Sequence, residues 1–121
     1  MLIQIQQWHD KTRYIIIDEC ASVHLELFDT AQDFGGTAFI WALWTNPDCR
    51  RKGHAERMLD RAERIAAENG HDAVYLEWLE KDTSREILDW YYRRGYQEQE
   101  FSGKGDYVLL KKSLTDKIQQ P

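Results

Sequence analysis

The 121-residue sequence predicts a single α/β domain of the α+β kind, built on a mixed, mostly antiparallel twisted sheet of six to seven strands. Three observations predict this class. The first 45 residues hold strand-like segments, two amphipathic helical segments then alternate with another strand, and two further strand-like segments close the chain. A chain of this length can bury one core and is too short for two ordinary domains.

The four strand-like segments of the N-terminal part differ in their polarity. Leu2 to Gln6 is short, and Arg13 to Glu19 is more apolar. Ser22 to Phe28 alternates apolar and polar residues, which is typical of a half-exposed strand. Thr37 to Trp44 is apolar on both parities, so we expect a central strand that is covered on both faces.

A helix is predicted between this central strand and a fifth strand at Ala73 to Leu79. Asn69 and Gly70 supply the signal that ends the helix. Because a helix connects the two strands, we expect them to be parallel neighbours in a right-handed strand-helix-strand unit. The apolar positions that repeat at helical spacing are Ala55, Met58, Leu59, Ala62, Ile65 and Ala66.

The last part of the chain predicts a short helix and two closing strands. Thr83 and Glu86 fit a capping box at the start of this helix, and Gly95 ends it. Residues 97–101 and 107–112 flank the glycine-containing turn SGKGD as a pair of strands. From about residue 114 the chain is a polar tail, and residues 1–121 form one domain.

Composition and charge limit the partners. The formal net charge of -5 and the pI near 5.3 argue against nucleic acid as a partner. No segment has the apolar length that spans a bilayer and the N-terminus lacks the features of a signal peptide, so we expect no membrane partner and a cytoplasmic protein. Cys20 and Cys49 have no C-x-x-C spacing, so we expect no disulfide, and no metal site is identified.

Three cations stand directly before the first predicted helix. A helix N-terminus carries partial positive charge, so Arg50, Arg51 and Lys52 are unfavourable there by roughly 0.3–1 kcal/mol each. Gly53 stands where a capping side chain is expected, and it lets a ligand approach the backbone closely. A bound phosphate reverses the sign of the repulsion, because the N–H groups and the cations then face an anion. The sequence therefore predicts a phosphate site at residues 50–55.

The spacing of this motif indicates the kind of phosphate ligand. Neither a Walker loop nor a dinucleotide-binding glycine pattern occurs. The pattern Arg50-x-x-Gly53-x-Ala55 follows a strand, and the run WYYRRGY at residues 90–96 follows on the second helix. Together they resemble the GNAT superfamily of acyl-CoA-dependent N-acetyltransferases over about residues 37–96. The resemblance implies a GNAT-like acyl-CoA N-acyltransferase fold with acetyl-CoA as co-substrate.

The resemblance also implies roles for individual residues. Tyr91 matches the tyrosine that protonates the departing CoA thiolate, and packing within the helix stripe is the alternative. Ser84 stands where the family often places an Asn facing the pantetheine, and an ordinary first-turn serine is the alternative. The other residues implied in binding acetyl-CoA are Leu43, Trp44 and Thr45 along the pantetheine and Arg50, Arg51, Lys52, Gly53, His54 and Ala55 around the pyrophosphate.

The general base stays open at this point. Relatives often place a carboxylate on the central strand, but residues 37–44 contain none. Four candidates are Glu77, Glu80, Asp82 and His24, each of which could equally be a surface or structural residue, and a water relay is another possibility.

The acceptor side is expected to be open. Only residues 7–11 stand where family members usually have one or two helices. Such a site suits a protein amine, or a pocket that a second subunit completes in a possible homodimer.

The sequence therefore predicts an N-acetyltransferase that moves an acetyl group from acetyl-CoA to a primary amine by direct attack in a ternary complex. The acceptor, a small molecule or a protein amine, is of unknown identity. Two alternatives stay open: a catalytically degenerate module that binds CoA or acyl-CoA, and a protein-interaction adaptor that uses the tryptophans.

Overall fold

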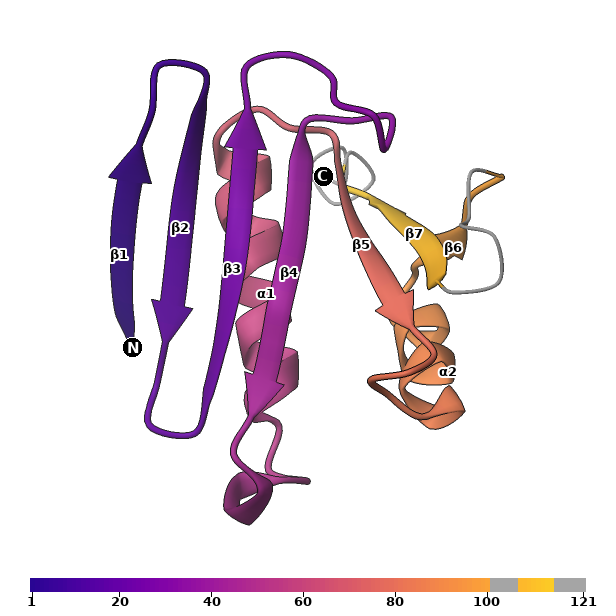
Figure 1. The fold of residues 1–121 in the computed structure, drawn as a ribbon. Coiled ribbons are helices and arrows are strands. Elements are labelled where there is room, and N and C mark those ends of the chain that lie inside the picture. Colours follow the sequence, from indigo (N-terminus) through magenta and orange to yellow (C-terminus); the bar gives the residue numbers. More distant parts are fainter. Residues whose placement is uncertain (101–106, 115–121) are drawn as a thin grey trace, which may run out of the picture.

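The computed structural model describes residues 1–100 and 107–114, and within them seven strands form one sheet. The sheet order is β1-β2-β3-β4-β5-β7-β6, and β4 and β5 are the parallel pair in an otherwise antiparallel arrangement. This confirms the predicted fold class (Figure 1). The elements are β1 (Leu2–Gln7), β2 (Lys11–Ile17), β3 (Ala21–Phe28), β4 (Ala38–Thr45), the 3-10 helix η1 (Pro47–Cys49), α1 (His54–Glu68), β5 (Ala73–Leu79), α2 (Arg85–Arg93), β6 (Gln97–Glu98) and β7 (Tyr107–Ser113).

One face of the sheet carries the main core. Figure 1 shows α1 behind β3 and β4, and α2 beside the end of β5. The apolar parity of β3, which includes Val23 and Leu25, packs there with Met58 and Leu59 of α1, and all four side chains are fully buried. Leu88 of α2 belongs to the same cluster. Burial of these alternating and helix-spaced residues fixes which face each element turns inward.

The other face is largely open, and the prediction that β4 is covered on both faces is wrong. Trp41 and Trp44 are 38% and 55% exposed. Phe39 packs in a small cluster under Phe34 of the β3–β4 connection, but no helix of the described ranges covers this side. The apolar run of β4 therefore lines a surface. We call the side that carries Glu26, Trp41 and Glu77 the open face.

The parallel strands β4 and β5 stay together over a short distance only. Their pairing is limited to Phe39 opposite Tyr75, and beyond this point the two strands diverge (Figure 1). The β3–β4 register shifts between Ser22 and His24, and Ala42 has φ +55°, which marks a bulge in β4. The second half of β4 thus keeps β3 on one side and faces a gap on the other.

Two details of the C-terminal part differ from the sequence prediction. Ser84, and not Thr83, is the N-cap of α2, and it makes no side-chain capping bond. The Thr83 hydroxyl instead donates to the Leu79 carbonyl at 3.1 Å, so the predicted capping box with Glu86 is wrong. Leu114 is 1% exposed and its N–H donates to the Asp72 carbonyl at 2.8 Å. The chain is therefore anchored up to Leu114. The rest of the predicted tail and the SGKGD turn lie outside the described residues.

Candidate active site

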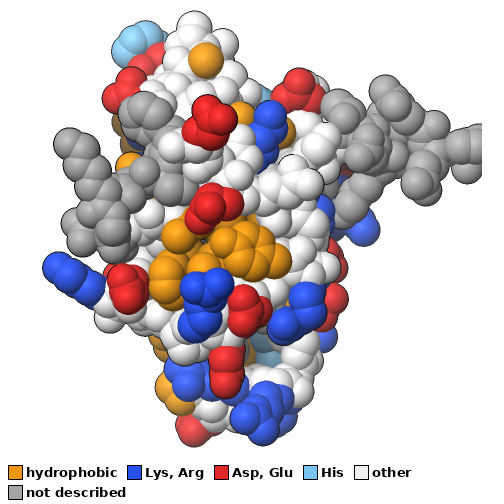
Figure 2. Space-filling model, turned by 90° about the vertical axis from the view of Figure 1, so that its right-hand side faces the viewer, with side chains coloured by type: hydrophobic (Ala, Val, Ile, Leu, Met, Phe, Trp, Pro, Cys, Tyr) orange, Lys and Arg blue, Asp and Glu red, His pale blue; other side chains and the backbone are white. Residues whose placement is uncertain are grey.

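The loop that enters α1 exposes cations and main-chain N–H groups. Gly53 is the N-cap with φ +79° and makes no side-chain cap, while Arg51 has φ +66°. Arg50, Arg51 and Lys52 are exposed, and the lower end of Figure 2, where Figure 1 places this loop, is rich in Lys and Arg. Within residues 1–100 and 107–114, the N–H groups of residues 51–55 have no backbone acceptor. The loop therefore offers unused donors and positive charge at a helix N-terminus, which suits a phosphate group.

Gly53 leaves little room for a side chain. A Cβ at this position would lie 3.2 Å from Nη1 of Arg57. That nitrogen donates to the Lys52 carbonyl at 3.2 Å and so closes the loop. The left-handed backbone favours glycine here, whereas the tip of the Arg57 side chain could move by the few tenths of an ångström that a Cβ needs.

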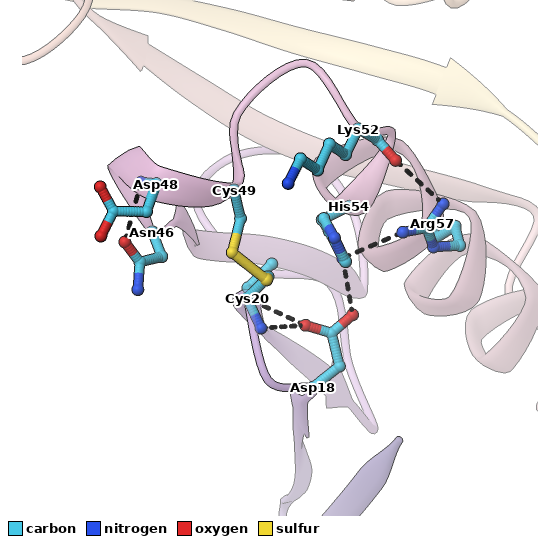
Figure 3. The surroundings of a disulfide bond; sticks show 9 residues. Asp18, Cys20, Asn46, Asp48, Cys49, Lys52, His54 and Arg57 are labelled. Carbon is cyan, nitrogen blue, oxygen red and sulfur yellow. Dashed lines mark hydrogen bonds and ion pairs between the residues drawn. A yellow bond between two sulfur atoms is a disulfide. The ribbon is translucent and has the colours of Figure 1, made fainter.

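His54 faces the protein with its side chain. Its Nδ1 lies 3.3 Å from Oδ2 of Asp18 and 2.9 Å from Nη2 of Arg57 (Figure 3). The other oxygen of Asp18 accepts from the N–H groups of Cys20 and Ala21 at 2.7 and 2.8 Å. Burial alone would raise the pKa of Asp18, but these hydrogen bonds and His54 outweigh it and lower that pKa. His54 therefore fixes the loop through its ring, and its backbone N–H is the part left for a ligand.

Cys20 and Cys49 form a disulfide, so the prediction of unpaired thiols is wrong. Their Cα atoms are 5.7 Å apart, across 29 residues of sequence (Figure 3). The sheet explains the contact: Ala21 pairs with Thr45, and the Asn46 N–H donates to the Cys20 carbonyl at 2.7 Å. The bond ties the β2–β3 turn to η1, directly before the cation loop.

A cleft of about 200 Å³ lies where β4 and β5 diverge. Leu43 lines it from β4, Glu77 from β5 and Tyr91 from α2. Tyr91 is 8% exposed, and burial raises its pKa to about 12. Its phenol is therefore neutral and able to donate over the whole physiological pH range. The predicted catalytic tyrosine and one predicted pantetheine residue thus meet in a single cleft.

The remaining pantetheine residues occupy two different settings. Trp44 and Thr45 pair with Ser22 and Ala21 of β3 through one edge, and their other edge borders the gap. Ser84 is exposed and its carbonyl accepts from Nε1 of Trp78 at 3.1 Å. It is not among the residues that line the cleft, so a contact of its side chain with pantetheine stays a prediction.

Among the candidate bases, Glu77 is the best placed. It borders the 200 Å³ cleft and also two cavities of about 360 and 530 Å³ on the open face. Its side chain is exposed, but partial desolvation raises its pKa, which moves the carboxylate toward the range of a useful proton acceptor. Asp82 also borders the cleft, whereas Glu80 lines none of the three cavities.

His24 occupies a different part of the open face. Its ring meets Trp41 edge-on at 4.4 Å between centroids. Its Nδ1 is buried and has no hydrogen-bond partner in the part of the chain that the structure describes. Burial and then the charge of Arg13 lower its pKa, so the ring is neutral at pH 7. It could accept a proton, but it borders none of the three cavities.

Three charged side chains that the sequence motifs did not point to, Lys11, Arg13 and Glu26, line the cavity of about 530 Å³. Glu26 is 8% exposed, accepts from Nε of Arg13 at 2.6 Å and pairs with Lys11 at 3.3 Å. The Arg13 guanidinium also lies over the rings of Trp8 and Trp41, at 5.0 and 5.3 Å. The period-2 alternation of the third strand placed Glu26 on the polar face, but its partners depend on the register of β2 against β3.

Ion pairs also join the helix of Tyr91 to α1. Arg94 binds Glu56 at 3.0 Å and also contacts Asp60, both on α1. Nearby, the Tyr96 hydroxyl donates to the buried carboxylate of Glu63 at 2.8 Å, and Lys112 binds the same carboxylate at 2.9 Å. These contacts hold α2 against the element that begins at the cation loop.

The sheet order and the diverging parallel pair give the chain the α+β fold of acetyltransferases. More narrowly, the chain belongs to the acetyltransferase (GNAT) family, which it matches over residues 3–96. No curated protein matches the sequence at a significant level.

Solved structures share this fold at low sequence identity. A GNAT-family acetyltransferase from Staphylococcus aureus Mu50 superposes with a TM-score of 0.65 at 15% identity, covering 86% of this chain and 68% of that one. PaiA N-acetyltransferase from Thermoplasma acidophilum, solved in complex with coenzyme A, superposes with a TM-score of 0.65 at 16% identity, covering 86% of this chain and 61% of that one. The ribosomal-protein-S18-alanine N-acetyltransferase of Escherichia coli superposes with a TM-score of 0.66 at 13% identity, covering 89% of this chain and 72% of that one. At these identities the likeness shows the fold. No helix among the described residues is long and apolar enough to cross a membrane.

Proposed function

We propose that this chain is an N-acetyltransferase that moves an acetyl group from acetyl-CoA to a primary amine by direct attack in a ternary complex. One observation carries the proposal. Tyr91 and Glu77, a proton donor and a proton acceptor, line the same cleft between diverging parallel strands, and that cleft lies beside the free edge of β4.

Acetyl-CoA would bind along β4 and end on the cation loop. The unpaired edge at Leu43, Trp44 and Thr45 offers backbone groups to the amides of the pantetheine arm, as a neighbouring strand would. The N–H groups of residues 51–55 would hold the pyrophosphate, with Arg50, Arg51 and Lys52 supplying positive charge. No step in this binding needs a metal ion.

The amine must lose a proton before it attacks. Glu77 would take that proton, directly or through water, and its raised pKa makes the transfer less unfavourable than for an ordinary carboxylate. The free amine nitrogen then bonds to the acetyl carbonyl carbon and the carbon–sulfur bond breaks. Negative charge develops on the sulfur, where the Tyr91 hydroxyl donates a hydrogen bond. The nitrogen loses its second proton, and this proton passes through water to the sulfur and restores the thiol. The products are the N-acetylated amine and free CoA.

The acceptor would reach the cleft from the open face. Glu77 borders the cleft and both larger cavities, and Asp33 adds a second carboxylate to the cavity of about 360 Å³. These charges favour a cationic amine. Because no helix in the ranges 1–100 and 107–114 covers this face, a protruding protein amine or a second copy of the chain fits as well as a small molecule. The homodimer and the cytoplasmic location stay predictions.

A CoA-binding module without turnover is the second candidate. The absence of a carboxylate from β4 favours it, because no base stands on the central strand itself. An adaptor without any CoA site is the third.

A screen of amines and peptides with acetyl-CoA, read as free thiol release, tests the proposal together with calorimetry against CoA. The proposed acetyl transfer is supported if the protein turns over any acceptor and the rate falls in the Glu77→Gln variant. Binding of CoA with no turnover on the whole panel points to the module, and no binding at all overturns the acyl-CoA site.

A further inference from the structure

Cys20, Cys49 and His54 bring two sulfur atoms and an imidazole nitrogen together, all within 4.8 Å of one another. From this group we propose that the chain binds Zn(II) once its disulfide is reduced. The inference does not depend on the acetyl transfer proposed above, because it concerns metal binding by residues of the turn and loop.

The spacing fits a small tetrahedral ion. Zn–S bonds of about 2.3 Å and Zn–N bonds of about 2.0–2.1 Å put ligand atoms roughly 3.3–3.8 Å apart. The three donors already lie within 4.8 Å, so only small side-chain movements are needed after the sulfur–sulfur bond is cleaved. Two thiolates and one imidazole form a ligand set that zinc prefers, with the fourth position left to water.

Each donor is held by contacts that do not involve the disulfide. Asp18 accepts from the Cys20 N–H at 2.7 Å and lies 3.3 Å from Nδ1 of His54. The Cys49 N–H donates to the Asn46 carbonyl at 2.8 Å, which fixes η1. A carboxylate that orients a ligating histidine is the usual support of such sites. Cys20 is 9% exposed and the His54 side chain 13%, so the ligands are already largely withdrawn from water.

The charges around the group are compatible with a divalent ion. Arg50, Arg51 and Lys52 follow Cys49 directly and favour the thiolate form that binds metal. Two thiolates cancel the charge of one Zn(II), so the loaded site adds no net positive charge to the loop.

The chemistry balances with a thiol or phosphine reductant. The reductant supplies two electrons to the disulfide and is itself oxidised, and two protons from water or the thiol complete the two Cys thiols. Zn(II) then displaces both thiol protons and bonds to the two sulfur atoms. Oxidised protein has no thiolate to offer, so the disulfide and the metal exclude each other.

Anaerobic titration of untagged, full-length protein with Zn(II), in competition with a coloured chelator, tests the proposal. One ion per chain is expected after reduction with a phosphine and removal of the excess, and none in oxidised protein. Co(II) in place of zinc should give the near-ultraviolet absorption of thiolate–metal bonds. His54→Gln should weaken the affinity by more than about tenfold, whereas His71→Gln should leave it unchanged, since His71 bonds to Thr37 instead.

Two results would overturn the assignment. One is reduced wild-type protein that holds no more zinc than the oxidised form. The other is a His54→Gln variant that binds as tightly as wild type, because the thiols alone would then account for the metal. Cys49→Ser should also lose the site, and if that variant does not fold, the comparison of oxidised and reduced wild type decides.

Discussion

Replacing Tyr91 with Phe removes one hydroxyl from the cleft and keeps the buried ring. Burial raises the pKa of this phenol to about 12, whereas an ordinary thiol titrates near 8.5. Complete transfer of the proton to a thiolate is therefore uphill by about 3.5 pKa units, or about 5 kcal/mol. The hydroxyl is thus expected to stabilise the departing sulfur as a hydrogen-bond donor.

The size of the effect follows from that role. A hydrogen bond to a charged group contributes about 1.5–3 kcal/mol, which corresponds to a loss of roughly 10- to 150-fold in kcat. The KM for acetyl-CoA should change little, since the bond forms as the thiolate develops. Because Tyr91 stays neutral up to a pH of about 12, wild type and variant should share the same alkaline limb.

Free thiol release at saturating acetyl-CoA measures the loss, with an acceptor taken from the screen. Tyr92→Phe is the matched control, because Tyr92 is the next residue of α2 and is 37% exposed. Its rate should equal that of wild type. The reasoning is refuted if Tyr91→Phe keeps the full rate, or if both variants slow equally.

The remaining predictions concern the loop, the base and the disulfide. Gly53→Ala and Gly70→Ala, at φ +79° and +88°, should each lower Tm through a backbone cost of about 1–2 kcal/mol, but Gly53→Ala alone should weaken CoA in calorimetry. Activity should rise with pH through the raised pKa of Glu77, and Glu77→Gln should abolish that limb. Because partial desolvation raises the folded pKa of Glu77, its ionised form slightly destabilises the fold. Solvent screens this exposed side chain, so Glu77→Gln should raise Tm only a little at neutral pH and lose this gain below the ordinary pKa of 4.5. The disulfide joins residues 29 positions apart, so its loss in Cys49→Ser should lower the free energy of unfolding by about 3.6 kcal/mol in urea titrations. Reduction of the wild-type disulfide should lower it by the same amount.

The parts of the fold that the sequence predicted well depend on local chemistry. The order of strands and helices, the start of α1 after Gly53 and its end at Asn69 all follow from periodicity and from glycine. The family assignment depends on two short motifs, at residues 50–55 and 90–96, and is confirmed over residues 3–96. Such signals act within a few residues of the chain, so they can be read without knowing the tertiary structure.

The disulfide, the exposed side of β4 and the candidate base could not be predicted, because they depend on strand register and on what covers the sheet. The Cys20–Cys49 bond exists because β3 pairs with β4 in a register that puts Ala21 opposite Thr45. The run of β4 is apolar on both parities whether a helix or a ligand-binding surface covers it, and only the structure shows Trp41 exposed.

The choice among the candidate bases also depends on the tertiary structure. Glu77 is one of four possible residues, and nothing in the sequence favours it over the other three. The structure separates it from Glu80, because Glu77 borders the cleft and both cavities of the open face while Glu80 borders none of them.

The ion pairs of Arg94 affect the width of the cleft. One wall of the cleft belongs to β4, which packs on α1, and the other carries Tyr91 on α2. The Arg94 guanidinium at the end of α2 pairs with Glu56 and Asp60 of α1, and so helps to hold the two walls at their distance. Loss of these ion pairs would widen the cleft in which we propose that the thioester binds, and the proposed turnover would then fall although no residue of the cleft itself had changed.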